Sequence, residues 1–150
     1  MQFDTAGCEI LRDGHTEGRL TGGCISLIVS TLGTDWEIDA TDSILVLEDI
    51  DVKPYQLDRM LTQLEHAGTL DKARGFVIGE MPNCAPHPSQ GHTIQDLLKS
   101  MLTKYNVPIL FGFPTGHSSR PNAIVPFGVQ AELSLDSIPT FRLLEPAVTL

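Results

Sequence analysis

The sequence is poor in positive charge and has no long apolar run, and each shortage excludes a class of protein. Lys and Arg number 10 against 19 Asp and Glu, giving a formal net charge of −9. We expect no nucleic-acid partner, because neutralising phosphates requires a basic face. A polybasic membrane anchor is unsupported for the same reason. No stretch reaches the roughly 18 apolar residues of a membrane-spanning helix, so we also expect no membrane partner.

Cysteines are scarce as well. Cys8, Cys24 and Cys84 are an odd number at wide spacings, which is not the pattern of a disulfide framework. Residues 1–7 lack the basic segment and apolar core of a signal peptide. These two observations predict a cytoplasmic location.

The composition is that of one globular domain over residues 1–150. Apolar residues make up 41% of the chain and charged residues 19%. A domain of this size buries roughly 68–70% of its unfolded surface, so a core forms without disulfides or metals. We find no internal repeat and no linker that would separate a second domain.

The middle of the chain alternates apolar runs with amphipathic segments. The runs Ser43–Leu47, Gly75–Gly79 and Ile109–Phe113 predict buried strands. Between them, Pro54–Ala67 and Thr93–Tyr105 place apolar residues three and four apart, which predicts helices. The order strand–helix–strand–helix–strand predicts right-handed parallel crossovers.

The flanking segments give weaker patterns. Residues 1–22 look polar and punctuated by glycine, apart from a short strand at Ile10–Arg12 that we expect to enter a turn at Asp13-Gly14. Residues 24–32 fit either a strand or a short helix, and we favour the helix.

Towards the C-terminus, the proline-rich residues 81–92 predict a loop. Residues 129–135 alternate apolar and polar side chains, which predicts an antiparallel strand beside residues 140–144. The predicted fold class is therefore α/β with mixed parallel and antiparallel strands.

A carboxylate and a histidine each follow an apolar run. Glu48 comes after the first predicted strand and His117 after the third, 69 residues later (117 − 48). Ligands meet the carboxyl ends of parallel strands, so both side chains are placed for function. Glu48 would then orient the imidazole of His117 as a general base. The alternative is a surface glutamate and a loop histidine that make no contact.

Six segments, in this order, resemble the C-terminal half of the LD-carboxypeptidases. They cover roughly residues 18–136 and are Gly22–Leu27, Leu45–Ile50, Pro54–Leu64, Gly75–Gly79, Gly112–His117 and Asn122–Gly128. The resemblance implies a swivelling three-layer β/β/α domain. By position it assigns Glu48 and His117 to a Ser–His–Glu triad, whose serine lies in a separate N-terminal domain that this sequence does not contain.

The resemblance also implies an activity. The family's members hydrolyse the L,D-peptide bond to a terminal D-amino acid in murein tetrapeptides during cell-wall recycling, and related members cleave peptide-nucleotide antibiotics. It implies a homodimer, a murein-derived peptide as substrate, and neither a metal nor an organic cofactor. It names no substrate-binding residue.

A nucleophile is missing from the pattern. No serine stands in a Gly-x-Ser-x-Gly or Gly-x-Ser-Asp context, including Ser118 beside His117. We therefore expect the chain to be inactive alone and to need the N-terminal domain as a partner. A non-catalytic peptide-binding module derived from such an enzyme, or a fragment of a microcin-type peptide-nucleotide hydrolase, remains an alternative.

Other polar residues invite interpretation. Cys24 stands where the family usually has Asn, which puts the usual specificity in doubt, although a buried cysteine opening a helix is the simpler reading. Cys84, His87 and His92 suggest a zinc site, but their spacing fits no closed four-ligand pattern and a solvated loop is the favoured alternative. We expect Asp51 to cap the helix at Pro54 and assign no role to Asp49.

Overall fold

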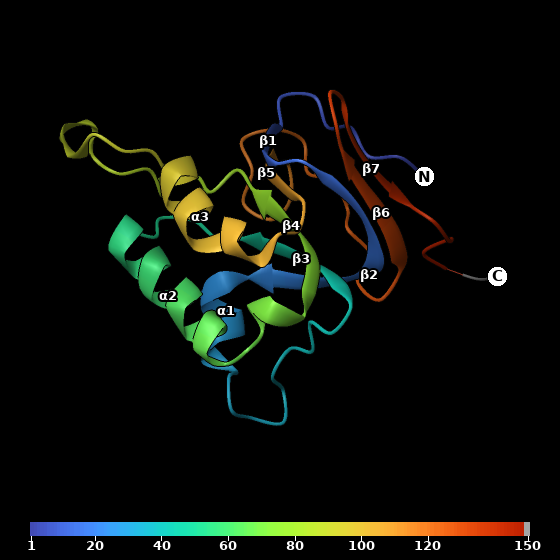
Figure 1. Cartoon of the computed structure of the whole chain (residues 1–150), viewed down its shortest axis with the longest axis horizontal. Coiled ribbons are helices and arrows are strands. Elements are labelled where there is room, and N and C mark those ends of the chain that lie inside the picture. The colour runs from blue at the N-terminus through green and yellow to red at the C-terminus, as the bar shows by residue number, and fades with distance from the viewer. Residues whose placement is uncertain (149–150) are drawn as a thin grey trace.

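The computed structural model describes residues 1–148, which form one curled sheet with helices on one face (Figure 1). The strands are β1 (Glu9–Arg12), β2 (Gly14–Cys24), β3 (Ser43–Glu48), β4 (Ala73–Gly79), β5 (Ile109–Phe113), β6 (Gln130–Leu135) and β7 (Pro139–Leu143). The helices are α1 (Ile25–Ser30), α2 (Pro54–His66) and α3 (Ile94–Leu102), with 3-10 turns at Leu70–Lys72, Pro88–Gln90 and Thr103–Tyr105. Within this range, no helix has the length and apolarity to cross a bilayer.

The sheet combines parallel and antiparallel pairing, as expected. Its strand order is β1-β5-β4-β3-β2-β6-β7. Strands β2 to β5 pair in parallel, and β1, β6 and β7 pair antiparallel at the two sides. The predicted α/β class is confirmed, and the parallel centre gathers the carboxyl ends of β3, β4 and β5 at one edge.

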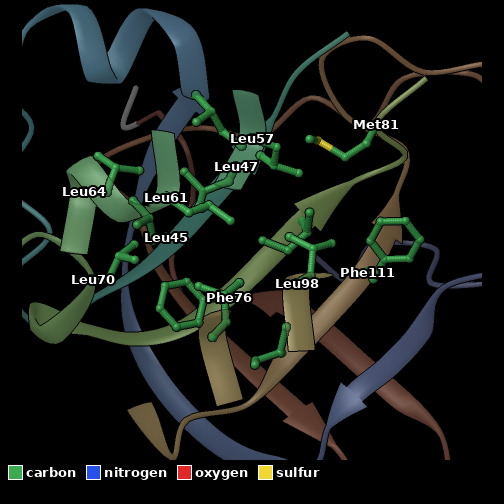
Figure 2. Packing of buried hydrophobic residues seen from close by; sticks show 14 of the residues in the cluster. Leu45, Leu47, Leu57, Leu61, Leu64, Leu70, Phe76, Met81, Leu98 and Phe111 are labelled. Carbon is green, nitrogen blue, oxygen red and sulfur yellow. The ribbon is translucent and has the colours of Figure 1, made fainter. Parts of the chain in front are cut away.

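Two hydrophobic clusters divide the molecule into three layers. Successive strand residues point to opposite faces, so β3 contributes to both. Leu45 and Leu47 pack under α2 against Leu57 and Leu61 (Figure 2). On the other face, Val46 belongs to a cluster with side chains of β6, β7 and the N-terminal segment. The helices, the parallel strands and the curled-over β6–β7 hairpin are therefore stacked as α, β and β layers.

Both longer helices begin within one residue of their predicted starts and α2 ends within one residue of its predicted end, but α3 ends at Leu102 and gives way to the 3-10 turn Thr103–Tyr105. Pro54 begins α2, and Gly68 follows it with φ +72° and donates its N–H to the carbonyl of Glu65 at 2.8 Å. At the start of α3, the hydroxyl oxygen of Thr93 accepts a hydrogen bond from the N–H of Asp96 at 3.1 Å. The starts of α2 and α3 follow the carboxyl ends of β3 and β4, which lie at the site edge.

The N-terminal flank differs most from the expectation. Much of the segment 1–22, which looks polar and punctuated by glycine, belongs to the longest strand, β2 (Gly14–Cys24), between β3 and β6. The expected turn at Asp13-Gly14 is wrong, since only Asp13 separates β1 from β2. A Cβ built at Gly22 would lie 1.8 Å from the carbonyl oxygen of Val46. The glycines that suggested a loop thus allow close approach of two strands.

The expected cap at Asp51 is also wrong. The side-chain oxygen of Gln56, inside α2, instead accepts the N–H of Lys53 at 2.9 Å. Asp51 adopts φ +58°, and its carboxylate accepts a hydrogen bond from the amide of Asn83 at 2.8 Å. The left-handed backbone at Asp51 turns its side chain towards the 81–92 loop rather than to the helix terminus.

Candidate active site

The fold brings Glu48 and His117 into direct contact. Nδ1 of His117 lies 2.8 Å from Oε2 of Glu48, and the backbone N–H of His117 donates to the same oxygen at 2.9 Å. The Glu48 side chain is 9% exposed and the His117 side chain is 50% exposed. Because an ionised carboxylate only accepts hydrogen bonds, an imidazole that binds it through Nδ1 donates from that nitrogen, and a neutral ring would then leave Nε2 as an acceptor.

Two glycines make room for this contact. Gly116 has φ +66°, and a Cβ there would lie 2.3 Å from the carboxyl carbon of Glu48. A Cβ at Gly79, the last residue of β4, would lie 2.8 Å from the Cβ of Glu48. Any larger residue at either position would displace the carboxylate from the imidazole.

The turn that carries His117 is tied down on both sides. The amide of Asn122 donates to the carbonyl of Gly116 at 2.8 Å. On the other side, the N–H and hydroxyl of Ser119 donate to Oε2 of Glu80 at 2.8 and 2.7 Å, and Nε of Arg120 donates to Oε1. Glu80 directly follows β4, so it occupies the same kind of strand-end position as Glu48.

Electrostatics keep Glu80 ionised. Burial of its carboxyl opposes ionisation, but the hydrogen bonds from Arg120 and Ser119 outweigh that effect and lower its pKa to about 2. The same ion pair raises the pKa of Arg120. The turn is therefore held by a permanently charged pair over the ordinary pH range.

Asp49, to which the sequence assigned no role, is a buried structural anchor. It is 3% exposed, and its Oδ2 accepts the N–H of Ser26 at 2.9 Å and the Ser26 hydroxyl. Its Oδ1 accepts the N–H of Ile50 at 2.8 Å. Asp49 thereby fixes the start of α1 beside the end of β3, where Glu48 lies.

Cys24 ends β2 and stands opposite Glu48 in the parallel ladder. It opens α1 as expected, but it is half-buried rather than buried, and its thiol lies 3.6 Å from the Ser26 hydroxyl. Within residues 1–148, no serine hydroxyl is hydrogen-bonded to His117. The dyad thus has no hydroxyl partner in the part of the chain described.

Residues 17–133 match the C-terminal domain of the LD-carboxypeptidases. The chain belongs to this family. It is 41% identical over 122 residues to a probable murein peptide carboxypeptidase of Bacillus subtilis, a match that covers 81% of this chain and 38% of the relative. It is 30% identical over 124 residues to the murein tetrapeptide carboxypeptidase of Pseudomonas aeruginosa, covering 80% and 40%.

Two solved structures illustrate the fold that this chain shares with known proteins. The muramoyltetrapeptide carboxypeptidase of Oxalobacter formigenes superposes with a TM-score of 0.78 at 28% identity, over 89% of this chain and 47% of that chain. The microcin C7 self-immunity protein MccF superposes with a TM-score of 0.83 at 22% identity, over 95% and 42%, which shows a likeness of fold. The chain spans less than half the length of each of these relatives.

The structure does not assemble the metal ligands considered from the sequence. Cys84 is buried, whereas His87 and His92 are exposed and hydrogen-bonded within their own loop. In the described range, three ligand atoms do come within 4.8 Å of one another at His15, Glu17 and Glu132, towards the end of β2 remote from Cys24. These three residues therefore lie away from Glu48 and His117. Glu132 also forms an ion pair with Arg142.

An open groove of about 600 Å³ lies beside the His117 turn. Its lining includes Phe3, Pro114, Arg120, Asn122 and Ile124 but neither Glu48 nor His117. The dyad therefore lies outside this concave surface, with the imidazole half-exposed and the carboxylate buried.

Proposed function

We propose that this chain is the histidine- and glutamate-bearing domain of a serine carboxypeptidase that hydrolyses the L,D-peptide bond of murein tetrapeptides in cell-wall recycling. The observation that carries the proposal is the 2.8 Å contact between Nδ1 of His117 and Oε2 of Glu48. This contact orients the imidazole as a Ser–His–Glu mechanism requires, because it engages Nδ1 and leaves Nε2 to receive a proton.

In this mechanism Nε2 of His117 removes the proton of a serine hydroxyl as the serine oxygen attacks the scissile carbonyl carbon. Glu48 stabilises the imidazolium that forms. The imidazolium then protonates the nitrogen of the departing D-amino acid, and the C–N bond breaks to leave an acyl-enzyme. His117 next activates water, which releases the L-centred peptide and restores the serine.

The serine and most of the oxyanion hole would come from an N-terminal domain. Three observations support this division: the matched region is a C-terminal domain, the chain spans less than half of its relatives, and the His117 side chain is half-exposed. We therefore expect the 150-residue chain to be inactive alone. A cytoplasmic location and a homodimer remain predictions, and sedimentation of the assembled protein tests the dimer.

The test is a chimera in which this chain replaces the C-terminal domain of the Bacillus subtilis relative. We expect the chimera to release D-alanine from a murein tetrapeptide and the isolated chain to release none. His117→Ala in the chimera should lower kcat by about 10²–10⁴-fold, the usual contribution of a general base. His66→Ala, which alters an exposed histidine on α2, is the matched control.

Two outcomes would contradict the proposal. Turnover that survives His117→Ala would remove the dyad from the chemistry. A well-folded chimera that binds the tetrapeptide without cleaving it would favour a non-catalytic binding module. Adding Cys24→Asn to an active chimera measures whether the family's usual residue changes the preference between tetrapeptide and peptide-nucleotide substrates.

A further inference from the structure

We infer that Glu80 and Arg120 are positioning residues, and that their ion pair holds the turn that presents the His117 imidazole to Glu48. The inference rests on the proposed role of His117 and extends it to two residues outside the triad. Neither side chain contacts the imidazole, so each would act through the backbone of the turn.

Both carboxylate oxygens of Glu80 accept hydrogen bonds from the turn that carries His117. Oε2 accepts the N–H and the hydroxyl of Ser119, and Oε1 accepts Nε–H of Arg120. The Glu80 side chain is 14% exposed, whereas Ser119 lies at the surface. Hydrogen bonds to an ionised carboxylate are roughly twice as strong as neutral ones.

Arg120 joins three separate segments of the chain. Besides Glu80, its guanidinium donates to the carbonyl of Ala6 at 2.5 Å and to the carbonyl of Gly112 in β5. Each of its three nitrogens is therefore occupied by a protein acceptor. Arg120 thus links the N-terminal segment, β5 and the end of β4 through three of the five N–H groups of its guanidinium.

The carboxylates of Glu48 and Glu80 bind different residues of the turn. Glu48 at the end of β3 binds it at His117, and Glu80 at the end of β4 binds it two and three residues later. Because β3 and β4 are hydrogen-bonded neighbours, the two anchors have a fixed separation. Without Glu80 the turn would keep the Asn122 bond to Gly116 but lose its anchor at Ser119 and Arg120, and we expect the imidazole to move with the loosened backbone.

The test measures the dyad directly, by NMR on the ¹⁵N-labelled chain. In the unmodified chain we expect a low-field Nδ1–H resonance for His117 and slow hydrogen exchange at its backbone N–H, both of which Glu48→Ala removes. Glu80→Gln and Arg120→Lys should broaden the resonance and speed exchange of the amide by about tenfold or more, because neither restores a charged, forked pair. Exchange of core amides such as Val46 reports any general loss of stability.

A matched ion pair elsewhere in the sheet provides the control. Nε of Arg142 donates to Glu132 across β6 and β7, remote from the turn. Glu132→Gln should leave both His117 signals unchanged. Where Glu80→Gln fails to fold, Ser119→Ala removes one bond to Glu80 and should show a smaller effect of the same sign.

Unchanged His117 signals in folded Glu80→Gln and Ser119→Ala proteins would overturn the inference, as would equal acceleration of the His117 and core amides. In an active chimera, Glu80→Gln should lower kcat with little change in KM, by up to about 100-fold for a misplacement of about 1 Å. An inactive unmodified chimera would count against the proposed function, while the NMR result on the chain alone would still decide the positioning role.

Discussion

His117 presents its backbone N–H and its imidazole Nδ1 to one and the same oxygen of Glu48, at 2.9 and 2.8 Å. The backbone of the turn at His117 and the imidazole ring therefore share one acceptor. Whatever displaces the Glu48 carboxylate should disturb both together, and whatever loosens the turn should release the ring.

Gly116→Ala tests this coupling. A left-handed backbone costs an alanine about 1–2 kcal/mol, and collision with the Glu48 carboxyl should add about 1–3 kcal/mol to the loss of unfolding free energy. Gly91→Ala is the matched control, because Gly91 has φ +69° with nothing within 4 Å of its built Cβ. Urea unfolding measures both variants. Equal losses for the two would show that the turn relaxes around the added methyl group.

Asp49→Asn should destabilise the protein by about 1–3 kcal/mol, since an amide group cannot accept from all three of the donors that its two oxygens now bind. Ser26→Ala removes only the hydroxyl donor and should cost less, about 0.5–1.5 kcal/mol. Denaturant midpoints of the two single variants and the double variant give the coupling. A double variant whose loss equals the sum of the two would show that the pair is not energetically linked.

Acid should weaken the protein through Glu80. Its pKa falls to about 2 in the folded state, below the ordinary value of 4.5. A depressed carboxyl pKa contributes stability that is fully present above the unfolded value and is lost as the pH falls from about 4.5 towards 2. Unfolding free energies should therefore decline less steeply over that window in Glu80→Gln than in the unmodified chain. Parallel declines would mean that Glu80 is not linked to folding.

Tyr105→Phe should leave the protein as stable or stabilise it by up to about 1 kcal/mol. The buried Tyr105 hydroxyl has no hydrogen-bond partner among residues 1–148, and burial together with Glu65 and Asp71 raises its pKa to about 12. Tyr55→Phe alters an exposed ring, 67% accessible, and should change stability by less than about 0.5 kcal/mol. A clear loss of thermal stability in Tyr105→Phe alone would indicate a hydrogen bond to the hydroxyl.

Local patterns were enough to predict most of the parallel centre. The apolar run Ser43–Leu47 is buried throughout because the strand has helices on one face and β6–β7 on the other. Pro54, Gly68 and Thr93 mark helix ends through their own backbone chemistry, which needs no tertiary partner. The apolar runs located Glu48 and His117 next to strand ends. The rule that ligands meet the carboxyl ends of parallel strands then made both residues candidates for function.

The rest depended on contacts between segments far apart in the chain. The sequence did not predict strand β2, because its glycines look like those of a loop. Their reason is the close approach of the backbone to Val46, which depends on the neighbouring strand β3. Asp49 and Glu80 follow strands just as Glu48 does, so the sequence could have raised them as candidates. It could not show that one anchors α1 and the other the His117 turn.

The sequence by itself determined the α/β class, the family and the two residues proposed for the dyad, because periodicity, caps and ordered motifs are local properties of the chain. Only the tertiary structure decided that Glu48 and His117 touch, since 69 residues separate them and the distance depends on the pairing of β3, β4 and β5. It also placed Gly116, Asp49, Glu80 and Arg120 around them, because steric room and hydrogen bonds depend on neighbours in space.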